Sequence, residues 1–205
     1  MTLQKLRFQK PRFQTAGFLR LKFALLTLAV SAVFAQYSSS AQSLEFTKTS
    51  YDAPAFSATY PVPDKDKPGV TYSSQSVTLK SGATATMHTY ALSIHNDFDA
   101  FLVIYCDANL QGDAAGLDLM LDGAVATLEN ATPSPKTDST FSGFSARAVA
   151  ANSTYTSGQT THSRTMYERI TVQGARVWQA LVICDKASNC TEADVNKFFN
   201  SIKIR

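Results

Sequence analysis

The chain has 205 residues, a length typical of one domain. Hydrophobic residues make up 44% of it, and with only 9 Gly and 7 Pro it is neither wholly disordered nor a collagen-like or low-complexity chain. The formal net charge of +3 is unevenly distributed, because residues 1–35 hold six cations and no acids. The remainder carries 13 cations against 16 acids, a net charge of −3, so we expect no nucleic-acid partner.

Residues 1–35 have the pattern of a secretory signal peptide. A basic start is followed by an apolar run from Phe23 to Ala35 that ends in small residues. Cleavage is predicted after Ala35, with Ala41 as a second candidate. The run is shorter than the roughly 20 residues that span a bilayer, but its long basic flank leaves an uncleaved anchor as the alternative. We expect a periplasmic or secreted protein or, in the alternative, one anchored to the inner membrane by residues 1–35, its one membrane contact.

Residues 36–50 are rich in Ser, Thr and Gln and predict a flexible lead-in to a single domain over residues 51–205. The first half of this domain has strand patterns. Residues 84–95 contain the apolar–polar alternation of a half-buried strand, and residues 101–106 are apolar throughout, as in a central strand. The expected strands are 56–61, 70–79, 84–95 and 101–106, with a hairpin between the second and third.

From Asp113 onward the apolar residues recur at the spacing of a helix, which predicts a helix that continues to Asn130. Asp113 itself is a plausible N-cap. A polar connection, a strand over 144–151 and a polar turn follow. Strands over 164–172 and 176–184 then form the strongest hairpin signal. A last helix begins at Thr191, which with Asp194 resembles a capping box.

Hairpin-joined strands build an antiparallel sheet whose apolar faces must be covered by helices. The sequence therefore predicts an α+β fold, with a mainly antiparallel sheet of about six strands covered by two or more helices.

Several short motifs carry a family resemblance. They are Phe56–Pro61, Tyr90-Ala91-Leu92, Leu117-Asp118, Asp122-Gly123-Ala124, Phe141–Arg147, Arg176–Val182 and Lys197–Lys203. The pattern resembles a group of exported bacterial proteins of unknown function and is similar to the PsbP-like α/β/α sandwich, named after an extrinsic subunit of photosystem II. It covers residues 55–205 and consists of packing motifs, so it implies a fold and carries over no functional residues. Relatives of this fold are chiefly binding and assembly factors, a weak analogy for function.

Three cysteines in an exported chain allow one disulfide. Cys184 ends a strand and Cys190 precedes the last helix, so a bond between them would fix the helix onto the sheet. Closing so short a loop stabilises by roughly 2 kcal/mol through lost chain entropy. Cys106 also ends a strand, so Cys106–Cys184 is the competing pair. Without a C-x-x-C motif, a redox enzyme is not expected.

Weak candidates for a metal site lie around the turn before the central strand: His95, Asp97, Asp99 and Asp107. Oxygen-rich turns suit Ca²⁺, but the spacing is not that of an EF-hand and acidic turns are usually solvated, so we expect no metal and no cofactor. The chain has no G-x-S-x-G motif, and we expect no catalytic residues. Tyr and Phe in the strands are expected in the core, whereas exposed aromatics on an uncovered sheet face would indicate a binding surface.

The function expected from these features is that of a non-catalytic exported domain. It would bind a protein or an envelope component through its sheet edge, its loops or a cleft between layers. One alternative is small-ligand or metal binding in a pocket between helix and sheet. The other is an undetected hydrolase, which would need a Ser–His or Cys–His pair within hydrogen-bond distance.

Overall fold

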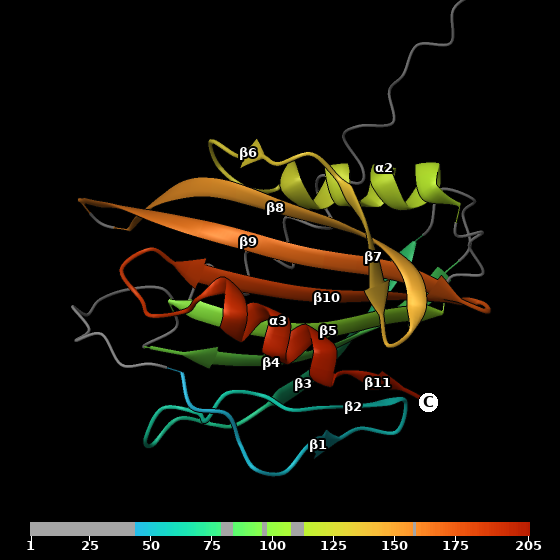
Figure 1. Ribbon diagram of the computed structural model, residues 1–205, viewed down its shortest axis with the longest axis horizontal. Coiled ribbons are helices and arrows are strands. Elements are labelled where there is room, and N and C mark those ends of the chain that lie inside the picture. The colour runs from blue at the N-terminus through green and yellow to red at the C-terminus, as the bar shows by residue number, and fades with distance from the viewer. Residues whose placement is uncertain (1–43, 79–83, 96–97, 108–112, 158) are drawn as a thin grey trace, which may run out of the picture.

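The computed structural model describes residues 44–78, 84–95, 98–107, 113–157 and 159–205 (Figure 1). The predicted signal peptide, most of the lead-in and Asp97 lie outside the described residues. The elements in chain order are β1 (Tyr51–Asp52), β2 (Phe56–Ala58), β3 (Thr71–Thr78), β4 (Thr84–Ile94), β5 (Asp99–Asp107), α2 (Ala114–Val125), β6 (Thr132–Pro133), β7 (Thr137–Phe141), β8 (Phe144–Ser157), β9 (Thr160–Gln173), β10 (Arg176–Asp185), α3 (Glu192–Ser201) and β11 (Lys203–Ile204).

The predicted α+β fold is confirmed. A large sheet of eight strands has the order β3-β4-β5-β10-β9-β8-β6, with β7 also paired to β8, and a small sheet has the order β1-β2-β11. Every strand pair is antiparallel. The sheet exceeds the expected six strands because β6 and β7 form within the segment predicted as a polar connection, where they are only two and five residues long.

The hairpin of β8 and β9 is longer than the sequence predicts. Residues 151–161, expected as a polar turn, extend both strands to the pair Ser157 and Thr160. Their many Ser and Thr side chains hide the strand, although threonine favours the pleated conformation. The hairpin of β9 and β10 was predicted closely, with Gln173 opposite Arg176 across a two-residue loop. Gly174 in that loop has φ +59°, which glycine adopts without strain.

Each face of the large sheet buries its own apolar layer. On β5, Phe101 and Val103 belong to the layer beneath α3 and the small sheet, whereas Leu102 and Ile104 belong to the layer beneath α2. Figure 1 shows α3 in front of β10 and β5, and α2 along β8. The strand predicted as central, β5, thus lies between two covered faces, as its unbroken apolar run indicates.

Both helices are anchored by polar contacts at defined points. The Asp113 side chain accepts from the backbone N of Gly116 at 2.7 Å and caps α2. Arg147 on β8 binds Asp118 of α2 through two hydrogen bonds, from Nε at 2.7 Å and from Nη2 at 3.1 Å. This two-pronged contact orients α2 over the sheet. None of the helices in the described residues is both long and apolar enough to cross a membrane.

The capping box that the sequence predicts is present at the start of α3. Thr191 Oγ1 accepts from the backbone N of Asp194, and the Asp194 side chain accepts from the backbone N of Thr191. At the other end, Ser201 Oγ accepts from the backbone N of Thr59 at 2.9 Å, which joins α3 to the segment after β2. The buried Val195 and Phe198 then face the sheet.

Candidate functional site

The residues considered for a metal site are divided between the two ends of β5. His95 and Asp99 meet at its start, with His95 Nδ1 2.6 Å from Asp99 Oδ2. Asp107 lies at its far end, where it accepts from Arg176 Nε at 2.7 Å. Asp97 lies outside the described residues, among which no group of three or more His, Cys, Asp or Glu side chains is arranged to hold a metal ion.

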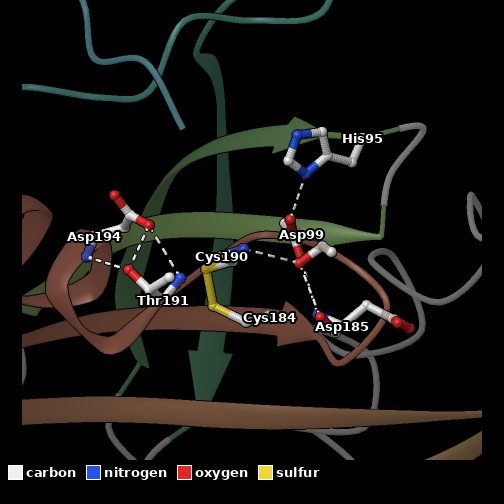
Figure 2. Close-up of a disulfide and its surroundings, with 8 residues drawn as sticks. His95, Asp99, Cys184, Asp185, Cys190, Thr191 and Asp194 are labelled. Atoms are coloured by element: carbon white, nitrogen blue, oxygen red, sulfur yellow. Dashed lines mark hydrogen bonds and ion pairs between the residues drawn. A yellow bond between two sulfur atoms is a disulfide. The ribbon is translucent and has the colours of Figure 1, made fainter. Parts of the chain in front are cut away.

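The disulfide lies at the Asp99 end of the sheet (Figure 2). Cys184 near the end of β10 is bonded to Cys190 just before α3, with Cα atoms 5.5 Å apart, an ordinary spacing for a disulfide. Cys106, the alternative partner of Cys184, is a half-buried free cysteine near the far end of β5. The bond therefore ties the entry of α3 to the central strands.

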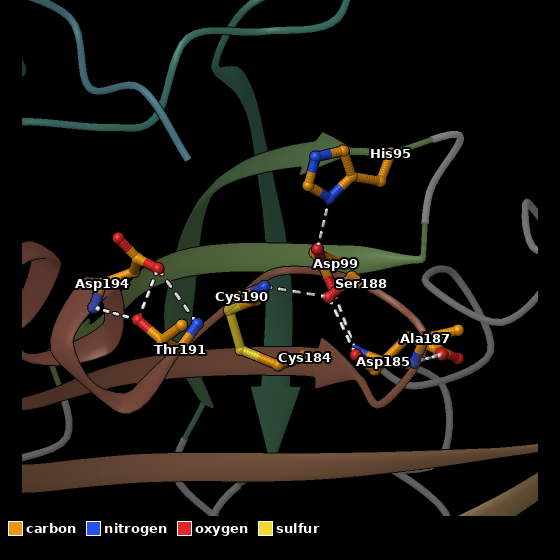
Figure 3. Close-up of polar contacts among 9 residues, drawn as sticks. All are labelled: His95, Asp99, Cys184, Asp185, Ala187, Ser188, Cys190, Thr191 and Asp194. Atoms are coloured by element: carbon orange, nitrogen blue, oxygen red, sulfur yellow. Dashed lines mark hydrogen bonds and ion pairs between the residues drawn. A yellow bond between two sulfur atoms is a disulfide. The ribbon is translucent and has the colours of Figure 1, made fainter. Parts of the chain in front are cut away.

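Asp99 is fully buried and organises the loop that the disulfide closes (Figure 3). Its Oδ1 accepts from the backbone N of Asp185 and from Ser188 Oγ, both at 2.8 Å. The backbone N of Cys190 in turn donates to Ser188 Oγ at 3.2 Å. Both oxygens of Asp99 thus have partners, as a carboxylate removed from water requires.

Asp185 is a second buried carboxylate in the same place, 3% exposed. Its Oδ1 accepts from the backbone N of Ala187 at 2.7 Å, and its Oδ2 accepts from Tyr155 Oη at 3.3 Å. His162, which stacks on Tyr155 with centroids 5.0 Å apart, has Nδ1 3.8 Å from Asp185 Oδ2. We call Asp99, Cys184, Asp185, Ser188 and Cys190 the latch.

Together with His95, the latch brings a serine, aspartates and a histidine close to one another, but not in the order that nucleophilic catalysis uses. In a catalytic triad, histidine lies between the serine and the aspartate and takes the proton of the hydroxyl. Here Asp99 lies between Ser188 and His95. Among the described residues, no hydrogen bond joins a serine or cysteine side chain to a histidine ring. The hydrogen bond to Asp99 raises the pKa of His95, because it stabilises the charged imidazolium.

Glu168 on β9 is a buried carboxyl that sequence reasoning missed. It faces α2 and is 1% exposed; Gln179 Nε2 donates to its Oε1 at 2.5 Å, and Oε2 has no partner among the described residues. Burial raises the pKa of Glu168 to about 8, so the group is mostly neutral at pH 7. The sequence does contain an indication that Glu168 is buried, because it shares its strand face with the apolar Met166 and Ile170.

A row of stacked side chains, one from each of four adjacent strands, begins at the Asp107 end of the sheet and runs diagonally to the edge strand, level with the middle of its neighbours. The rings of Tyr72 and His88 are 6.1 Å apart and those of His88 and Tyr105 are 4.5 Å apart, each pair at an angle of 18°. Arg176 Cζ lies 4.7 Å from the Tyr105 ring centroid and ends the row on β10. We call Tyr72, His88, Tyr105 and Arg176 the ring ladder.

The ladder differs from an ordinary core cluster at one end. Tyr105 is 7% exposed, as expected for a core aromatic, whereas Tyr72 is 52% exposed. The Tyr72 hydroxyl lies 2.9 Å from His88 Nδ1, so the exposed ring is still held in place. The sequence prediction that strand aromatics belong to the core is thus wrong for Tyr72, which marks an uncovered part of the sheet.

Tyr72 lies on β3, an edge strand with unusual composition. Its eight residues, TYSSQSVT, include no charge and no proline, and all but Val77 are exposed. Within the part of the chain that the structure describes, only β4 pairs with β3. The opposite edge is different, because β6 and β7 cover β8 and the segment that holds them contains Pro133 and Pro135.

No known family matches the chain, and no curated protein matches it. Among solved structures, a protein of unknown function from Pseudomonas aeruginosa, PA94, is 13% identical and aligns over 74% of this chain and 87% of its own with a TM-score of 0.33. LpqN of Mycobacterium tuberculosis, which is involved in cell envelope biogenesis, is 14% identical over 71% and 89%, with a TM-score of 0.36. TM-scores this low do not establish a shared fold, so the PsbP-like resemblance stays a prediction.

Proposed function

We propose that this protein is an exported, non-catalytic domain that binds a partner protein through the free edge of its large sheet. The observation that carries the proposal is β3, an eight-residue edge strand with no charged residue and no proline. Export is supported by the basic and apolar pattern of residues 1–35 and by the disulfide, which forms readily in oxidising compartments. The compartment would be the periplasm or the medium, or the outer side of the inner membrane if residues 1–35 stay attached.

An edge strand of this kind is suited to pairing with another chain. Its outward N–H and C=O groups form a ready template for an additional strand, and soluble proteins usually block such edges with Lys, Pro or very short strands. The β6 and β7 edge is protected in this way, since β6 has two residues and includes Pro133. Strand addition supplies main-chain hydrogen bonds for affinity and side-chain contacts for specificity. The two edges thus have different roles, one blocked and one available.

The non-catalytic part of the proposal is supported by the contacts around the disulfide, at the Asp99 end of β5. Ser188, Asp99 and Asp185 are engaged in contacts that hold the loop of residues 185–190, and His95 is paired with Asp99. A nucleophile in use would instead need its hydroxyl directed to a base. Ser188 Oγ is within 2.8 Å of both Asp99 Oδ1 and the Asp185 carbonyl oxygen, neither of which is a histidine.

A second candidate function is small-ligand binding between α2 and the sheet. Glu168 favours it, because a neutral carboxyl with an unpartnered oxygen in an apolar layer could hydrogen-bond to a ligand that enters there. A ligand of this kind would protect the amides of β9 and α2 from hydrogen exchange, whereas a strand partner would protect those of β3.

The test is site-specific photo-crosslinking in the native envelope fraction. A benzophenone amino acid replaces Ser73 on β3 or, as the matched control, Thr132 on β6 at the opposite edge. We expect one crosslinked protein from the β3 position and none from β6; the purified partner should then bind wild type but not Gln75→Pro, which removes a donor from the strand. If the partner bound wild type and Gln75→Pro equally well, and circular dichroism showed that the variant is folded, the proposal would be overturned.

A further inference from the structure

We propose that the partner segment continues the ring ladder: it adds beside β3 as an extended strand and places an aromatic or arginine side chain against Tyr72. This inference rests on the proposed edge binding and specifies the chemistry of the partner. It follows from three features of the described residues, namely the spacing of the ladder, the side chain at its inner end, and the registers open to a second copy of this chain.

The ladder spacing is that of the sheet itself. Adjacent strands lie about 4.7–4.9 Å apart, and side chains on one face of neighbouring strands contact each other directly or diagonally. His88 is directly opposite Tyr105, and Tyr72 is the diagonal neighbour of His88. The stack therefore advances by one side chain per strand and stops at Tyr72 because β3 is the last described strand. One more strand would supply the next position.

The inner end of the ladder shows which side chains fit such a stack. Arg176 lies with Cζ 4.7 Å from the Tyr105 ring centroid and 5.6 Å from that of Trp178. A planar guanidinium stacks on an aromatic face much as another ring does, with an added cation–π attraction. The same two classes of side chain, aromatic and arginine, are therefore expected to suit the open end at Tyr72.

A second copy of the chain fits this position poorly. When two β3 strands pair about a twofold axis, two opposed side chains lie on the same face of the joined sheet only if the sum of their residue numbers is even. Registers that use nearly the whole strand then place Tyr72 opposite Ser76 or Thr78, and neither side chain continues the stack. Placing Tyr72 opposite itself leaves only the strand start, residues 71–73, paired within β3, and placing it diagonal to itself, opposite Ser74, pairs only residues 71–75. The geometry points to a different polypeptide.

The rest of β3 limits the partner further. Ser74 and Ser76 lie on the same face as Tyr72, and no residue of the strand is charged. Small or β-branched polar residues at alternate positions of the partner would pack beside these serines without a buried charge. The predicted recognition element is thus one aromatic or arginine side chain in an otherwise small, polar, extended segment.

The test uses peptides of about ten residues in which Thr and Ser alternate around one variable position, occupied by Tyr, Arg, Ala or Glu. Each is titrated into protein purified after expression of the full-length chain, with backbone amides followed by NMR. We expect the Tyr and Arg peptides to shift β3 amides and to bind about fivefold more tightly than the Ala peptide, the scale of one stacking contact. Tyr72→Ala should remove this preference and Tyr72→Phe should retain it, whereas Leu119→Ala, on an exposed α2 residue, should change nothing.

The remaining outcomes of the titrations separate the ladder inference from the proposed edge binding. Binding at β3 without preference for Tyr or Arg would overturn the ladder inference while leaving edge binding intact. Peptides that shift no β3 amide would overturn both. Concentration-dependent dimerisation through β3, measured by sedimentation, would replace the proposed partner with a second copy.

Discussion

The two ends of β5 have opposite characters. At Asp99 the end is closed: a disulfide, two buried carboxylates and a serine hold the loop that leads into α3, and both oxygens of Asp99 have partners. At Asp107 the end is open, because it is where the ring ladder starts, and the ladder runs diagonally across the sheet to the exposed Tyr72 on the edge strand, level with Val103. The difference indicates that stability is concentrated at one end while the other remains available for contact, a division common in proteins that bind.

The largest effect should come from the closed end. Asp99→Ala would leave the hydroxyl of Ser188, the backbone N of Asp185 and the imidazole of His95 without their partner, so we expect a loss of about 3–5 kcal/mol in the free energy of unfolding. Urea denaturation measures it. The matched control is Asp107→Ala at the other end of the same strand, where the half-exposed pair with Arg176 should contribute less than about 1 kcal/mol. Similar losses for the two variants would remove the distinction between the ends.

The next largest effect is a pH dependence of the stability that arises from the buried Glu168. The pKa of Glu168 is raised to about 8, so folded protein keeps a proton that unfolded protein loses near pH 4.5. Stability should therefore fall by a few kcal/mol as pH rises from about 4.5 to 8. Glu168→Gln should abolish most of this slope in denaturation curves, whereas Glu129→Gln at an exposed site should not. An unchanged slope in Glu168→Gln would contradict the assignment.

His95 should add a smaller slope of the same sign. Its pKa is raised, chiefly by the hydrogen bond to Asp99, so its stabilising charge is fully present below the ordinary pKa near 6.5 and is lost as pH rises through the raised value. His95→Gln should flatten this part of the curve, measured in the Glu168→Gln background to separate the two groups. A steeper curve would mean that the imidazole is neutral in the folded state.

Removing the disulfide should lower the free energy of unfolding by about 2 kcal/mol, because the bond restricts the unfolded chain by closing a loop between cysteines six residues apart. The double variant Cys184→Ser with Cys190→Ser tests this by thermal unfolding. Cys106→Ser, which changes the half-buried free cysteine near the open end, is the control and should have a much smaller effect. If the control were the more damaging variant, the closed end would not be where the stability lies.

The smallest effect on stability is expected at Tyr72. Its half-exposed ring, which contacts His88 and Tyr90, makes Tyr72→Ala cost about 1 kcal/mol, whereas Tyr90→Ala on the adjacent strand should cost several kcal/mol because Tyr90 is 6% exposed. Both values come from the same denaturation assay. A large cost at Tyr72 would assign the outer part of the ladder to the core and weaken its role as a contact surface.

Local patterns predicted much of the fold. The unbroken apolar run of β5, the alternation in β4 and the Thr191–Asp194 cap each depend on a few neighbouring residues, and all three are present in the structure. The ends of β8 and β9 were missed because Ser and Thr are common in both turns and strands. The candidate surface could not be predicted, since Tyr72, His88, Tyr105 and Arg176 meet only through the register of four strands.

The position of Trp178 has a practical consequence. It is the single tryptophan of the chain, 1% exposed, with its ring 4.9 Å from that of Tyr105 in the ladder. Emission excited at the red edge of the absorption band therefore comes from one fluorophore, and that fluorophore touches the stack that ends at β3. Occupation of the edge could be followed through the intensity and lifetime of this intrinsic signal, without attaching a dye to the strand whose accessibility is in question.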